Sequence, residues 1–275
     1  MFYKIPLLWL CFLAAAGPAA LPAAPVLPLT VLNELPHEAG HYSQGLFFHR
    51  SVLYESAGLY GRSSLSSWRL PAGRPPELKQ KRRLAERFFA EGADLAEGEI
   101  YLLTWRENTA LVFDPESLEL KRELAYAGEG WGLAWDGERF WRSDGSARLY
   151  PHRAGDFSPA GEPLTVRDGR RETSFLNELE WDPLRGLLLA NVYGQDLVAV
   201  IEPGRGRVLA WLDARPLRVL ALAAGLENGG RPLDTALNGL ALAPSGLWLT
   251  GKFWPRLYQV AWPPEGLEAL IESGG

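Results

Sequence analysis

The sequence predicts an all-β fold, a five-bladed β-propeller closed by an N-terminal strand. The first observation is that short runs of alternating apolar residues, separated by Gly, Pro and Asp, dominate the chain after residue 25, as expected for strands joined by turns. The second is an internal repeat whose units start 47, 40, 46 and 61 residues apart. The units begin at Gln44-Gly45-Leu46, Glu91-Gly92-Ala93, Trp131-Gly132-Leu133, Asn177-Glu178-Leu179 and Asn238-Gly239-Leu240.

Each unit is assigned to one blade. Repeats of about 40 to 50 residues in a strand-rich chain are typical of four-stranded sheets that stack around an axis. In four of the units an aromatic residue follows the glycine by nine positions, at Tyr54, Tyr101, Trp141 and Trp248. This second regularity indicates that the units share one strand pattern.

Two segments lie outside the regular repeat. We expect Leu29–Leu35 to add a strand to the blade that holds Trp248 and Tyr258, because this pairing would close the ring. The longest spacing contains an insertion, Ala214–Gly230. Its first part is rich in Ala and Leu and ends before Asn228, which predicts a short helix.

The N-terminus has the pattern of a cleaved signal peptide over residues 1–24. Lys4 supplies a positive charge, and the apolar run Ile5–Ala16 that follows is too short to span a bilayer comfortably. Small residues come next, as at a cleavage site. The alternative is an uncleaved anchor. We expect an exported protein, periplasmic or secreted, without a membrane partner after cleavage and with one domain over residues 25–275.

Composition limits the partners and the chemistry. The chain has 275 residues and a net charge of −5, and its basic run Lys79–Arg83 is too short to predict nucleic-acid binding. Cys11 is the sole cysteine and lies in the predicted signal, so the mature chain has no disulfide and no Cys-ligated metal. The four histidines show no metal-ligand spacing. We expect a monomer.

Propeller symmetry turns the repeat into a site prediction, because equivalent positions form rings around the axis. One ring holds the residues before the glycine position, which are Gln44, Glu91, Trp131, Asn177 and Asn238. A second ring, thirteen residues after that position, holds Gly58, Trp105, Gly145, Lys252 and either Val192 or Tyr193. Apolar residues would close a tunnel at a lower desolvation cost than these polar ones. The rings therefore predict a functional site at one tunnel mouth.

The same residues resemble those of the plant- and bacterial-type glutamine cyclotransferases, also called glutaminyl cyclases. The resemblance covers about residues 40 to 260, and that family is a five-bladed propeller. Tyr42, Ser43, Ala90 and Tyr193 depart from the family's usual Phe, Thr, Gly and Trp. The matching segments are Tyr42–Leu46, Leu53–Ser56, Gly58–Leu65, Leu103–Trp105, Gly128–Leu133, Ser143–Ser146, Leu176–Glu180, Ala190–Val192, Leu237–Gly239, Thr250–Lys252 and Trp254-Pro255.

The resemblance implies that the N-terminal Gln of peptides or proteins is converted to pyroglutamate, with release of ammonia and without a metal cofactor. It implies that Glu91 is the catalytic glutamate, that Lys252 is the family's lysine, and that Gln44 and Asn177 belong to the catalytic set. The aromatic substrate pocket it implies consists of Tyr42, Phe89, Trp105, Trp131 and Tyr193.

These residue types suit the reaction. An N-terminal amine has a pKa of about 7.7 to 8.0, so a useful fraction is neutral at pH 7 and needs no strong base. Glu91 can carry the proton from the attacking amine to the leaving nitrogen. Lys252 can stabilise the charge that develops on the carbonyl oxygen, while Gln44 and Asn177 orient the substrate.

Three alternatives stay open. A non-catalytic exported propeller could bind peptides or glycans through the same aromatic mouth, but it would not need both Glu91 and Lys252. A metal-dependent lactonase would need a tunnel ring rich in His or carboxylates, whereas this ring has one carboxylate. A structural divalent cation held by backbone carbonyls in the tunnel would leave no signal in the sequence.

Overall fold

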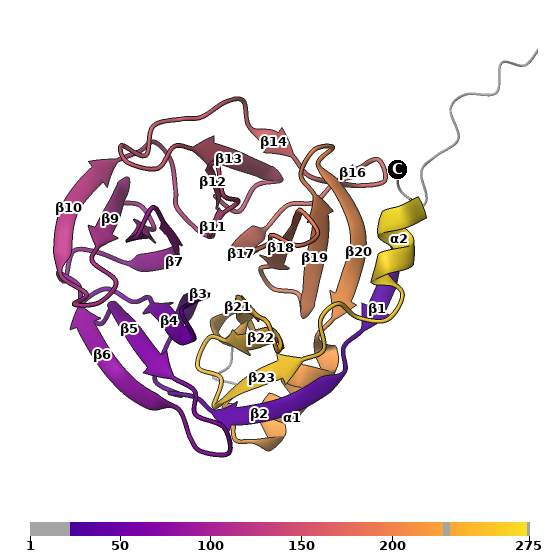
Figure 1. The fold of residues 1–275 in the computed structure, drawn as a ribbon, viewed down its shortest axis with the longest axis horizontal. Coiled ribbons are helices and arrows are strands. Elements are labelled where there is room, and N and C mark those ends of the chain that lie inside the picture. The colour runs from indigo at the N-terminus through magenta and orange to yellow at the C-terminus, as the bar shows by residue number, and fades with distance from the viewer. Residues whose placement is uncertain (1–22, 228–231, 274–275) are drawn as a thin grey trace, which may run out of the picture.

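The computed structural model describes residues 23–227 and 232–273 of the chain. The secondary structure of this part is mainly β-sheets, which stand around a central axis with one strand of each sheet nearest the centre (Figure 1). None of the helices in this part of the chain is long and apolar enough to cross a membrane. The predicted signal peptide lies almost wholly outside the described residues.

Four sheets are four-stranded blades whose neighbouring strands run antiparallel. Three follow the chain from the inner to the outer strand: β3 (Ser43–His49), β4 (Val52–Ala57), β5 (Ser64–Arg69) and β6 (Glu77–Arg83); β7 (Ala90–Ala96), β8 (Glu99–Thr104), β9 (Thr109–Phe113) and β10 (Leu120–Ala125); β11 (Leu133–Trp135), β12 (Phe140–Ser143), β13 (Arg148–His152) and β14 (Leu164–Thr165). The fourth joins β21 (Leu237–Ala243), β22 (Gly246–Gly251) and β23 (Arg256–Val260) to β2 (Val31–Pro36).

The pairing of β2 with β23 closes the ring. Glu34 lies opposite Tyr258 in this antiparallel register, so a strand from early in the chain and three strands from late in the chain share one blade (Figure 1). This is the pairing predicted for Leu29–Leu35. Closure through a shared blade leaves no blade held by one neighbour alone.

The prediction of a five-bladed propeller, with one four-stranded blade for each repeat, is wrong. The propeller-like ring has four such blades, and the remaining sheet has seven strands. Strands outside the repeat cover the outer edge of β20, where unpaired backbone groups would otherwise be left. These extra strands are not part of the repeated strand pattern, so the spacing of the repeats could not reveal them. This sheet consists of β17 (Leu176–Asp182), β18 (Leu187–Val192), β19 (Leu197–Glu202), β20 (Arg207–Asp213), β15 (Arg167–Asp168), β16 (Arg171–Glu172) and β1 (Val26–Pro28).

The predicted helix in the insertion is confirmed as α1 (Arg215–Ala223). Pro216 occupies its first turn, where a missing N–H costs nothing, and Leu217 and Ala221 lie one turn apart and are buried. A short 3₁₀-helix, η1 (Pro232–Thr235), follows, and α2 (Leu267–Ser273) ends the described chain. Asn228, before which the helix was predicted to end, lies outside the described residues.

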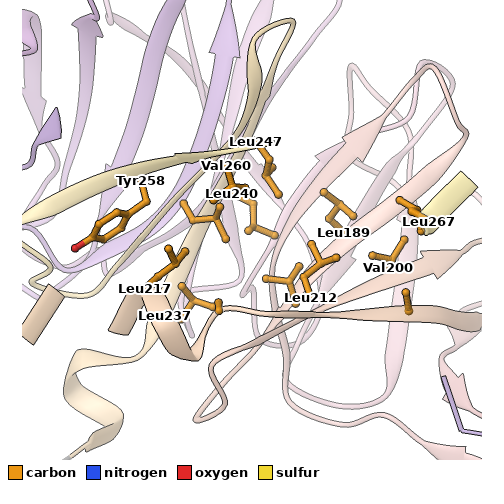
Figure 2. Packing of buried hydrophobic residues seen from close by; sticks show 14 of the residues in the cluster. Leu189, Val200, Leu212, Leu217, Leu237, Leu240, Leu247, Tyr258, Val260 and Leu267 are labelled. Carbon is orange, nitrogen blue, oxygen red and sulfur yellow. The ribbon is translucent and has the colours of Figure 1, made fainter. Parts of the chain in front are cut away.

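Apolar clusters fill the spaces between neighbouring sheets. Figure 2 shows the cluster between the seven-stranded sheet and the closing blade, where Leu189 and Leu212 meet Leu240 and Leu247. Leu217 of α1 belongs to the same cluster. Burying one such side chain contributes roughly 1.5–3 kcal/mol, so the faces of the sheets hold the ring together.

Glycine is required where the inner strands meet. A β-carbon on Gly132 would lie 2.0 Å from the carbonyl oxygen of Asn177, and one on Gly92 would lie 2.6 Å from that of Trp131. The fourth repeat has Glu178 in place of this glycine. Its carboxylate accepts a hydrogen bond of 3.2 Å from the backbone N–H of Leu46. The glycines of the repeat thus lie where the backbones of neighbouring inner strands approach closely.

A buried network reinforces the closure beside β2. The Glu55 carboxylate accepts hydrogen bonds from His37 Nε2 at 2.9 Å, His41 Nδ1 at 2.8 Å and Ser43 Oγ at 2.7 Å. Nδ1 of His37 donates to the carbonyl oxygen of Trp254 at 2.7 Å. Burial opposes a charge on His37, but the attraction of Glu55 outweighs it and raises the pKa of His37.

His37, His41 and Glu55 also place three metal-ligand atoms within 4.8 Å of one another, a juxtaposition that their sequence spacing does not indicate. The hydrogen bonds favour an ionic network instead. Lys81 Nζ lies 2.7 Å from Nε2 of His41, and an ammonium can only donate. Nδ1 of His41 therefore carries its proton towards Glu55 and offers no lone pair to a metal.

We predict that Gly132→Ala destabilises the fold, because the added methyl group collides with the backbone of β17. Overpacking of this kind costs roughly 1–3 kcal/mol. Urea unfolding followed by circular dichroism measures the loss. Gly204→Ala is the matched control, since no atom lies within 4 Å of a β-carbon there. Equal unfolding midpoints for Gly132→Ala and the wild type would contradict the close approach.

Candidate active site

A cavity of about 470 Å³ opens at one mouth of the tunnel. All nine residues predicted for the site line it: Tyr42, Gln44, Phe89, Glu91, Trp105, Trp131, Asn177, Tyr193 and Lys252. Leu59, Asp234 and Phe253 complete the lining. The structure therefore brings together residues from every sheet of the ring.

Strand direction explains why they meet. Gln44 and Glu91 lie near the starts of the inner strands β3 and β7, while Trp105 and Lys252 directly follow the second strands β8 and β22. Because each second strand runs antiparallel to its inner strand, the start of one and the end of the other lie at the same end of the tunnel. Both predicted rings thus face one mouth.

Bulges interrupt strand pairing at these positions. Between Ser43 and Gly45, and between Ala90 and Ala93, the inner strand has one more residue than its partner. The same irregularity occurs in β17 and β21. A bulge bends the strand and re-aims a side chain, so each one accompanies a polar residue of the repeat at the tunnel mouth.

Glu91 and Lys252 are the buried charged pair of the cavity, with exposed fractions of 5% and 4%. Burial raises the pKa of Glu91 well above its ordinary value; Lys252 opposes this rise, and the nearby Glu129 and Glu107 add to it. Burial lowers the pKa of Lys252 to about 8, against the attraction of Glu91 and Asp234. Among the described residues, no direct ion pair joins Glu91 to Lys252.

Two tyrosine rings hold the Lys252 ammonium. Its Nζ lies 4.4 Å from the ring centre of Tyr42 and 4.8 Å from that of Tyr193. Cation–π attraction at a desolvated site contributes about 2 kcal/mol. The rings place the charge at the edge of the cavity without neutralising it, which leaves its hydrogens available to a ligand.

The side-chain amides of Gln44, Asn177 and Asn238 differ in their hydrogen-bond partners. Nδ2 of Asn238 donates to the carbonyl oxygen of Ser43 at 3.0 Å and to Oε1 of Gln44 at 2.9 Å. Asn238 therefore orients Gln44 without lining the cavity, and the Gln44 amide nitrogen is free to face a ligand. Asn177 lines the cavity, and its buried Oδ1 has no protein partner.

Aromatic side chains form a continuous wall. The Phe89 ring centre lies 5.4 Å from that of Trp105 and 6.1 Å from that of Tyr42. The Trp131 and Tyr193 ring centres are 5.8 Å apart. Such ring contacts fix the orientation of the aromatic side chains.

Sequence reasoning missed Asp234 and Phe253. Asp234 belongs to η1, beyond the insertion, so it has no equivalent in the other repeats. Phe253 follows Lys252 in a left-handed conformation with φ of 61°, and its ring packs 5.3 Å from Tyr42. Adjacency to Lys252 is the one signal that could have indicated Phe253.

Comparisons with known proteins point to one family. The model of the glutamine cyclotransferase family matches residues 5–262. The glutaminyl-peptide cyclotransferase of Arabidopsis thaliana is 33% identical over 237 residues, which cover 84% of this chain and 70% of that protein. The crystal structure of Myxococcus xanthus glutaminyl cyclase superposes with a TM-score of 0.76 at 30% identity, covering 87% of this chain and 97% of that one.

We predict that the Lys252 ammonium titrates near pH 8, because its surroundings are desolvated. Lysine labelled with ¹³C and ¹⁵N gives few signals, since the chain has five lysines, and Lys252→Arg identifies the signal concerned. The ¹³Cε shift followed against pH measures the midpoint. In Glu91→Gln the midpoint falls, because the attraction that raises the pKa is removed. A midpoint near the ordinary 10.5 would contradict the burial of Lys252.

Proposed function

The chain belongs to the glutamine cyclotransferase family and is a glutaminyl-peptide cyclotransferase, and we propose that Glu91 and Lys252 carry its reaction. One observation carries this proposal. The two residues are far apart in the sequence, yet both are buried in one cavity, and no direct ion pair joins them. The space between an unpaired carboxyl group and an ammonium suits a polar substrate group.

The substrate is a peptide whose N-terminal Gln enters the cavity while the rest of the chain stays outside. Trp105 and Trp131 pack against the Gln side chain and exclude water. Asn177, which lines the cavity, orients the α-amine. The free amide nitrogen of Gln44 supports the side-chain amide. These contacts favour the folded conformation that ring closure needs.

In the reaction, the neutral α-amine attacks the side-chain carbonyl carbon, and a C–N bond closes the five-membered ring. The carbonyl oxygen becomes negative and is stabilised by the Lys252 ammonium. Glu91 takes the proton that the attacking nitrogen loses and delivers it to the amide nitrogen. The bond from carbon to that nitrogen then breaks, the carbonyl re-forms, and ammonia and pyroglutamate leave.

The electrostatics of the cavity support these roles. A carboxyl group whose pKa is raised by burial holds a proton more readily than an exposed one, as a proton shuttle near neutral pH must. Lys252, with a pKa of about 8, is mostly charged at pH 7. Its positive charge is then present when the oxyanion forms.

We propose that the reaction needs no metal ion. The described residues that line the cavity include neither His nor Cys, and their carboxylates are Glu91 and Asp234. A metal-dependent lactonase would need a richer set of ligands. Side chains of the cavity move the proton and stabilise the negative charge in the proposed reaction.

We propose that the protein is exported, because Lys4 and the apolar run Ile5–Ala16 have the pattern of a signal peptide. The N–H of Ala24 donates to Asp168 at 2.7 Å, so Ala24 belongs to the folded part. N-terminal sequencing of the protein from its native cells should find a mature chain that begins after the apolar run, between Gly17 and Ala24, slightly earlier than the residue 25 that the predicted signal boundary gives. A chain that keeps Met1 would support the anchor instead.

We predict that Glu91→Gln cyclises a Gln-initiated dipeptide roughly 10²- to 10⁴-fold more slowly than the wild type, the usual contribution of general acid–base catalysis. KM changes little, because the amide fills the same space and the aromatic walls remain. Lys252→Ala lowers kcat by about 10²- to 10³-fold, as expected for one lost oxyanion partner. An ammonia-release assay measures all three proteins.

The controls separate chemistry from folding. Circular dichroism checks that each variant is folded, and a chelator added to the wild type should leave turnover unchanged. Near-normal kcat in Glu91→Gln would show that the proton travels by another route. Loss of turnover on chelation, with the fold retained, would overturn the metal-independent mechanism.

A further inference from the structure

Glu129 joins two walls of the cavity from behind. Its Oε2 accepts a hydrogen bond of 2.9 Å from Nε1 of Trp105 and one of 3.0 Å from Nε1 of Trp131. Trp105 follows β8 of one blade, and Trp131 precedes β11 of the next. One carboxylate oxygen, which has two lone pairs, therefore connects two indoles that belong to different sheets.

The backbone that carries Glu129 is itself anchored. The buried Arg142 donates from Nη1 to the carbonyl oxygen of Glu129 and from Nη2 to that of Ala127, the latter at 3.2 Å. Nδ2 of Asn108 donates to the carbonyl oxygen of Gly128 at 2.6 Å. Protein groups thus hold the segment between β10 and β11 in place without any ligand.

The remaining oxygen of Glu129 has a weaker partner. Oε1 accepts a hydrogen bond of 3.1 Å from Nε of Arg106, whose guanidinium also stacks 3.7 Å from the ring centre of Trp105. The exposed fractions of Arg106 and Glu129 are 59% and 38%. Ion pairs this exposed contribute little, so the two indole hydrogen bonds are the main interaction of this carboxylate.

We propose that Glu129 is a positioning residue for the cyclisation, which sets the spacing of Trp105 and Trp131 and so the affinity for the N-terminal Gln. It contacts neither the reacting atoms nor Glu91, and this role rests on the proposed function of the cavity. A wall fixed in advance loses less freedom when the substrate binds. We call the bridge from Glu129 to the indoles of Trp105 and Trp131 the clamp. The clamp therefore affects KM more than kcat.

The variants Glu129→Asp and Glu129→Gln distinguish the effect of side-chain length from the effect of the negative charge. Asp keeps the charge, but its shorter side chain cannot bridge both indoles; Gln keeps the length and one acceptor oxygen. We expect Glu129→Asp and Glu129→Ala to raise KM about 10-fold, the usual effect of losing such hydrogen bonds. Glu129→Gln stays within about 3-fold of the wild-type KM, and kcat stays within about 3-fold in all three variants.

A second readout needs no activity. In a ¹⁵N-correlation spectrum, the indole N–H signals of Trp105 and Trp131, assigned with Trp105→Phe and Trp131→Phe, should both move in Glu129→Asp and stay near their wild-type positions in Glu129→Gln. Glu123, an exposed glutamate that pairs with Arg87 at 3.0 Å, supplies the control. Glu123→Asp leaves KM and both signals unchanged.

Each result has one meaning. A normal KM in Glu129→Asp together with a raised KM in Glu129→Gln would show that charge, and not the clamp, matters, and would overturn the inference. Unmoved indole signals in Glu129→Asp would also overturn it. A wild-type protein that releases no ammonia would refute the proposed function, while the indole signals would still test the clamp.

Discussion

Around the tunnel, the backbones of neighbouring inner strands come too close for a β-carbon between them. A methyl group on Gly132 would lie 2.0 Å from a carbonyl oxygen of the next sheet, so these positions favour glycine. The inner strands bulge at this point, and the residue before the glycine position turns to the tunnel mouth. Glu91 owes its place in the cavity to this backbone geometry.

The same crowding creates the electrostatic character of the site. Glu91 and Lys252 are more than nine-tenths buried, and no direct ion pair neutralises them. Burial therefore raises the pKa of Glu91 and lowers the pKa of Lys252, because it disfavours the charged form of each group. A carboxyl group with a raised pKa and an ammonium with a lowered one are thus held at the edge of one small cavity, which suits proton transfer and oxyanion stabilisation.

Rigidity of the cavity comes from groups behind it as much as from its lining. Asn238 orients the amide of Gln44, and Glu129 joins the indoles of Trp105 and Trp131. Both supporting residues connect neighbouring sheets, so the spacing of the walls depends on how the sheets pack. The network of Glu55 with His37 and His41 similarly joins the closing blade to the first one.

The sequence by itself determined the β-rich fold, the ring-closing strand, the helix of the insertion and nine of the twelve residues that line the cavity. Seven of the nine follow from the repeat, because a repeated structure places equivalent residues at equivalent points, and the family resemblance added Tyr42 and Phe89. Only the tertiary structure decided what the repeat does not encode. The extra strands on β20 pair through backbone groups, which any sequence provides. Asp234 lines the cavity and Glu129 lies behind its wall, both in segments between the repeated strands. The pKa values of Glu91 and Lys252 depend on burial, which arises only when the sheets pack together.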